Sequence, residues 1–76
     1  MQLVLEPVSD AVFRVLTGQG AHVGNLKLAQ GLWKFKAIGY DVSGAVLPGW
    51  GPLTDYHNTV LAFPDLALVN AMLVPI

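Results

Sequence analysis

The sequence predicts an α+β domain, in which an antiparallel meander of three or four strands carries one C-terminal helix packed on a sheet face. Three observations predict it: polar and apolar residues alternate through 11–40, glycine-containing turns interrupt that alternation at 18–20 and 30–31, and an apolar segment follows Pro64. The 76 residues suffice for a single small domain, residues 1–76, with one core.

The first two strands are expected at 2–7 and 11–17, joined by a short turn at 8–10. In the first, Leu3 and Leu5 share one face, because successive side chains of a strand point to opposite sides. In the second, Phe13 and Val15 face the side opposite to Val12, Arg14 and Leu16.

Two more strands are expected at 21–29 and 32–40. The turns before them contain glycines, which adopt the positive φ of tight hairpin turns, and Gly24 is interpreted as a bulge. The alternation directs six side chains to the core: Phe13, Val15, Leu26, Leu28, Trp33 and Phe35.

Past Tyr40 the alternation weakens. Four short segments are expected: a turn at 41–44, a strand at 45–47, a loop at 48–52 that presents Trp50, and a helical turn at 53–57 capped by Thr54. Residues 58–63 are ambiguous, with a short strand slightly favoured.

A helix is expected over residues 64–74, because Pro64 suits a first helical turn and Asp65 complements the helix dipole. Its apolar residues leave only Asn70 as an interruption, and a helix without a polar face is usually buried on several sides. The sequence therefore predicts a self-associating interface made by Trp50, Leu66, Val69, Met72 and Leu73. The alternative is a helix held in a cleft formed by residues 45–63.

The charges of the chain are segregated. All basic residues lie between positions 11 and 40, where there is no acid: Arg14, Lys27, Lys34 and Lys36. Alternation places these cations on the sheet face that also bears Tyr40, which predicts a possible anion-binding face for nucleic acid or another polyanion. The alternative is an ordinary solvated strand surface, and the isoelectric point near 6.0 does not favour nucleic acid.

Asp55 and His57 lie two residues apart and would share a face on a strand, as an acid–base pair or two metal ligands do. The favoured alternative is a capped turn with His57 packed under the loop. The glycines match neither a dinucleotide fingerprint nor a phosphate-binding loop. No catalytic residue, metal or cofactor is therefore expected.

The composition favours a partner protein. Hydrophobic residues make up 54% of the chain and charged residues 12%, so few charges are available to cover the surface. The chain has no cysteine, and no apolar run reaches the roughly 18 residues of a membrane span. Because Glu6 comes too early for a signal peptide, we expect a soluble cytoplasmic protein with no membrane partner. The sequence thus predicts a non-enzymatic interaction domain that works as a homodimer or higher homo-oligomer.

Overall fold

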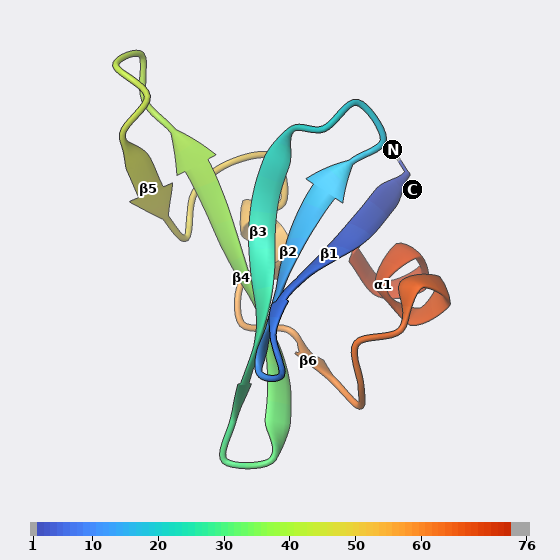
Figure 1. The fold of residues 1–76 in the computed structure, drawn as a ribbon. Coiled ribbons are helices and arrows are strands. Elements are labelled where there is room, and N and C mark those ends of the chain that lie inside the picture. The colour runs from blue at the N-terminus through green and yellow to red at the C-terminus, as the bar shows by residue number, and fades with distance from the viewer. Residues whose placement is uncertain (1, 74–76) are drawn as a thin grey trace.

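The computed structural model describes residues 2–73, which form an antiparallel sheet and one C-terminal helix (Figure 1). The sheet contains β1 (Leu3–Ser9), β2 (Val12–Thr17), β3 (His22–Ala29), β4 (Leu32–Tyr40), β5 (Val46–Pro48) and β6 (Val60–Leu61). A short 3-10 turn, η1 (Thr54–Tyr56), separates β5 from β6, and α1 (Leu66–Leu73) follows. The prediction of an antiparallel sheet followed by one helix is confirmed.

The first four strands run as a meander in the order β1-β2-β3-β4. Gln30 and Gly31 both have positive φ, 54° and 77°, as the two central residues of a tight hairpin turn require. The register of β2 on β3 shifts between Val15 and Leu16, next to Gly24, where the sequence predicts a bulge.

The sheet has six strands rather than three or four, because two later segments add to the second edge of β4. β6 pairs with Trp33 and Lys34, and β5 pairs with residues 38–40. Between these two pairings, Phe35 donates its N–H to Thr59 O at 2.8 Å and accepts from Asn58 N–H at 2.8 Å. Both segments were expected as short or ambiguous strands. Neither pairs with more than three residues of β4, so the alternation of polar and apolar residues in them is too short to predict which strand they join.

The core lies on one face of the sheet and consists of ten buried residues: Leu3, Val15, Val23, Leu26, Phe35, Ala37, Leu53, Leu61, Val69 and Leu73. Gly24 is part of this face because the Phe35 ring lies over it, and a Cβ added there would be 2.4 Å from that ring. Leu28 departs from its predicted place in the core: 39% of it is exposed, since the β3–β4 hairpin extends past the end of β2.

The helix supplies Val69 and Leu73 to the core and contacts β1, beside which it lies in Figure 1. It begins two residues later than predicted, and residue 74, its predicted last residue, lies outside the described residues. Asp65 caps it, accepting from Leu68 N–H at 2.9 Å.

One predicted cap is wrong. Thr54 does not cap η1; its hydroxyl instead donates to the carbonyl oxygen of Gly49 at 2.6 Å. The threonine therefore fastens the turn to the loop that precedes it.

Candidate functional site

A hollow of about 410 Å³ lies beside β5 and is lined in part by the aromatic residues Tyr40 and Trp50. We call it the aromatic hollow. Its lining is Ala21, His22, Val23, Ile38, Gly39, Tyr40, Leu47, Trp50, Gly51 and Pro52. None of these residues is an acid, a lysine or an arginine, so the hollow suits an uncharged, largely apolar occupant.

Trp50 stands at this hollow on a rigid loop and is 66% exposed. Gly49 and Gly51 on either side both have positive φ, 83° and 100°. Gly51 also lies against β4 so closely that an added Cβ would be 2.1 Å from the Ile38 carbonyl oxygen. The close approach of Gly51 to β4 thus anchors the backbone of the loop that carries this large exposed aromatic side chain.

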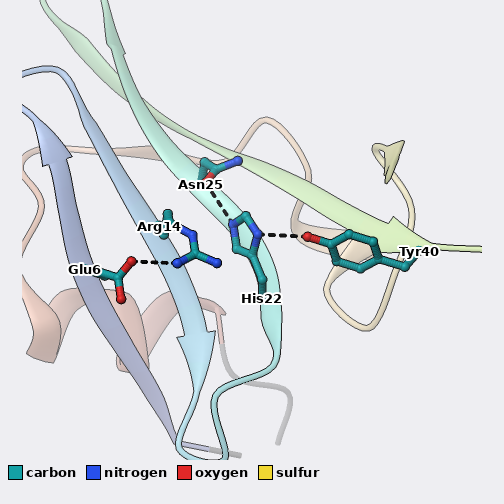
Figure 2. Close-up of polar contacts among 5 residues, drawn as sticks. All are labelled: Glu6, Arg14, His22, Asn25 and Tyr40. Atoms are coloured by element: carbon teal, nitrogen blue, oxygen red, sulfur yellow. Dashed lines mark hydrogen bonds and ion pairs between the residues drawn. The ribbon is translucent and has the colours of Figure 1, made fainter. Parts of the chain in front are cut away.

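A short chain of hydrogen bonds between β4 and the neighbouring β3 holds Tyr40 (Figure 2). Its hydroxyl lies 3.0 Å from His22 Nδ1, while His22 Nε2 lies 2.9 Å from Asn25 Oδ1. Because an amide oxygen only accepts, Nε2 carries the hydrogen, and the neutral imidazole then accepts at Nδ1 from the tyrosine hydroxyl. Both ring nitrogens of His22 are therefore used to orient Tyr40.

The predicted anion-binding face forms on the side of the sheet away from the core, which we call the outer face. It carries all four basic residues: Arg14 on β2, Lys27 on β3, and Lys34 and Lys36 on β4. Figure 2 shows Arg14 paired with Glu6 of β1, at 2.6 Å. This neutralises one of the four cations.

Among residues 2–73, the other three cations have no carboxylate partner. Lys27 lies directly opposite Lys34 in the β3–β4 register, and Lys36 donates to the amide oxygen of Asn58, which carries no charge. Within residues 2–73 the one ion pair is Glu6–Arg14. Like charges directly opposite each other in a sheet destabilise it, so the Lys27–Lys34 pair is a local defect without a structural compensation.

Asp55 and His57 do not form a pair. Asp55 lies in η1 and is exposed, whereas His57 turns toward β4 and its Nδ1 accepts the N–H of Ala37 at 3.0 Å. The lone pair that a base or a metal ligand would need at Nδ1 is thus taken by the backbone. Residues 2–73 also contain no group of three His, Cys, Asp or Glu side chains able to hold a metal ion.

The residues of the predicted self-association interface are split. Val69 and Leu73 are fully buried in the chain's own core, while Leu66 and Met72 remain 44% and 39% exposed. Trp50 follows β5, and the helix contacts β1, so these residues lie at opposite edges of the sheet. The interface residues are therefore not brought together on one surface.

Two features of the site went unpredicted. The pairing of Glu6 with Arg14 had a signal, because the short turn at 8–10 brings these two outward-facing residues into register. The hollow had none, since its lining comes from the separate segments 21–23, 38–40 and 47–52.

No protein-family model matches this chain, and comparisons with curated proteins and with solved structures also gave no match. Among the described residues, no helix combines the length and the apolarity needed to cross a bilayer.

Proposed function

We propose that this chain is a small non-enzymatic interaction domain that self-associates. The observation that carries the proposal is Trp50, two thirds exposed and fixed by the backbone beside an uncharged hollow. A two-fold dimer places the same patch of each subunit against the other, so the indole of each copy meets the hollow of its partner. Tryptophan is also among the residues that contribute most to binding at such interfaces.

Exposed apolar side chains around the hollow support a second copy as the partner. They lie on the β4–β5 hairpin and the loop after it: Tyr40, Val42, Val46, Leu47 and Trp50. Asp41 is the one charged residue in 40–50, so this surface has few of the charged groups that usually keep monomers apart.

The exposed stripe of α1 is the other surface that the sequence suggests for self-association. It offers Leu66 and Met72 but no aromatic ring. Its other large side chains are Val69 and Leu73, which are buried in the core, and Leu68, which is partly buried against it. We therefore place the main contact at the aromatic hollow, with the helix stripe as a smaller surface at the opposite edge.

Sedimentation of the purified chain over a range of concentrations tests this proposal. We expect a dimer whose dissociation constant rises about 30-fold on Trp50→Ser, because truncating a central aromatic costs about 2 kcal/mol or more. The matched variant Met72→Ser should leave the constant nearly unchanged. A reversed ranking would move the interface to α1, and a monomer at all concentrations would end the proposal.

A second function is supported by the uncompensated lysines. Lys27 and Lys34 face each other with no acid within ion-pair distance among residues 2–73, an arrangement that a bound anion would stabilise. We propose that these two residues and Lys36 form an anion-binding face. Retention on a heparin column should fall on Lys27→Gln with Lys34→Gln, and each phosphate contact should contribute about −0.9 to the slope of log affinity against log salt. Unchanged retention would contradict this function.

A further inference from the structure

The β3–β4 hairpin projects beyond the rest of the sheet. The N–H of Leu28 donates to the Ala11 carbonyl oxygen at 2.8 Å, and β2 begins at Val12, so residues 29–32 pass the end of β2 (Figure 1). This tip ends in the tight turn at Gln30 and Gly31, so it is an ordered part of the fold.

Apart from Gln30 in the turn, the side chains of the tip are apolar although they face solvent. Leu28 is 39% exposed and Leu32 is 49% exposed, and Ala29 between them is exposed as well. A hairpin tip with no core to cover would normally carry polar residues. Two leucines there indicate that the tip meets an apolar environment.

Cations stand directly behind this tip on the outer face. Ala29 pairs with Leu32, Lys27 with Lys34 and Asn25 with Lys36, so apolar side chains at the end of the hairpin are followed by two opposed lysines and then by a third. Their charges have no carboxylate partner among residues 2–73. The order from the tip inward is therefore apolar, then cationic.

We propose that the β3–β4 hairpin binds the surface of an anionic lipid bilayer. Leu28 and Leu32 enter the boundary between headgroups and acyl chains, and the ammonium groups of Lys27, Lys34 and Lys36 meet the lipid phosphates. The proposal rests on the anion-binding face described above and names its partner. A nucleic acid would use the lysines equally well, but it offers no apolar layer to the leucines.

The expected binding is reversible and depends on both components. Each lysine near an anionic surface contributes on the order of 1 kcal/mol, which is about fivefold in the partition coefficient. Two leucines that enter only partly contribute about tenfold together, and neither group suffices alone.

The experiment is cosedimentation of the full chain with phosphatidylcholine vesicles, with and without phosphatidylserine. We expect binding that requires phosphatidylserine and weakens with salt. Lys27→Gln with Lys34→Gln should reduce the partition coefficient about 25-fold, and Leu28→Ser with Leu32→Ser about tenfold. Val4→Ser is the matched control, since Val4 is an exposed apolar residue of β1 that pairs with Leu16, away from the hairpin tip, and should change nothing.

Leu32→Ser alone replaces the double variant if circular dichroism shows that the latter does not fold. Vesicle binding that ignores the leucine variants would overturn the proposal. So would binding to a short DNA duplex but not to vesicles, although the anion-binding face would survive if that binding needed the lysines. No binding to either probe would end both the lipid proposal and the anion-binding face.

Discussion

The outer edge of β1 and the second edge of β4 are each completed in part by a polar side chain that takes the place of a strand. At β1, the amide of Asn70 accepts the N–H of Leu3 at 2.8 Å and donates to its carbonyl oxygen at 3.0 Å. At β4, the imidazole of His57 accepts the N–H of Ala37 at 3.0 Å, and the Ala37 carbonyl oxygen accepts from Gly49 N–H at 2.8 Å. Both edges thus avoid unpaired backbone groups at these buried positions.

The two edges differ in the other contacts that hold the strand beside Asn70 or His57. Asn70 is the polar contact between α1 and β1, and it ends the sheet there. Pro7 further along β1 has no N–H to offer, so another chain has little on which to extend the sheet. His57 instead bonds β4 between the stretches that pair with β5 and with β6. Each of these two strands also pairs with β4 through its own backbone. One edge depends on a single side chain, and the other on several backbone contacts.

The largest effect is expected where backbone meets backbone at the β4 edge. Gly51→Ala places a Cβ 2.1 Å from the Ile38 carbonyl oxygen, at a φ of 100° that other residues rarely adopt. The clash and the strain together should lower the free energy of unfolding by about 3 kcal/mol or more. Urea unfolding measures it.

Gly44→Ala is the control for the conformational part of this effect. Gly44 also has a positive φ, 87°, but nothing lies within 4 Å of its Cβ position. Its substitution should therefore cost only about 1 kcal/mol. Equal losses for the two variants would show that the close approach of Gly51 to β4 does not matter.

The second prediction concerns the β1 edge. Asn70→Ala leaves both backbone groups of Leu3 without a partner beside a fully buried side chain, which should cost about 2 kcal/mol. In a domain of this size, that lowers the melting temperature by about 8 to 16 °C. Asn70→Asp keeps the acceptor for Leu3 N–H but loses the donor, so its melting temperature should fall between those of the wild type and Asn70→Ala.

His57→Ala should have a smaller effect than Asn70→Ala, about 1 kcal/mol, because it removes one hydrogen bond from an edge that β5 and β6 also hold. Amide hydrogen exchange locates the loss. The Ala37 N–H should exchange faster, while the Phe35 N–H, bonded to Thr59, keeps its protection. A cost above that of Asn70→Ala would contradict the proposed redundancy of the β4 edge.

The sequence predicts the meander well, because β1 to β4 are long enough for alternation and their turns contain glycine. It does not predict the bonds of the two edge residues, for a common reason. Asn70 looks like an interruption of an apolar helix, and His57 is expected to pack under its loop, with no sign of a bond to β4. Their partners, Leu3 and Ala37, are 67 and 20 positions away, and no local pattern connects them.

The outer face and the β3–β4 tip were likewise predicted only in part. Alternation alone gathers the cations on the outer face, but the charges that remain free depend on register, which pairs Arg14 with Glu6. The exposed leucines of the β3–β4 tip follow from how far β2 extends, so the expectation of no membrane partner could not take them into account. Side-chain type is local information, whereas exposure and charge compensation are tertiary.

The smallest effect tests whether β5 is held by its turn or by its pairing with β4. The Ser43 hydroxyl donates to the Asp41 carboxylate at 2.7 Å, and the N–H groups of Ser43 and Ala45 donate at 2.9 Å. These bonds, that of the Ser43 hydroxyl first, lower the pKa of Asp41 below its ordinary 3.8. A lowered pKa stabilises the fold above the unfolded-state pKa, and this contribution disappears as the pH falls through the folded-state pKa.

Amide shifts of Ser43 and Ala45 should therefore titrate below pH 3.8 and lose that transition on Asp41→Asn. If the β5 amides keep their exchange protection through the transition, then pairing with β4 holds the strand, whereas their loss would make β5 as dependent on one side chain as β1 is on Asn70.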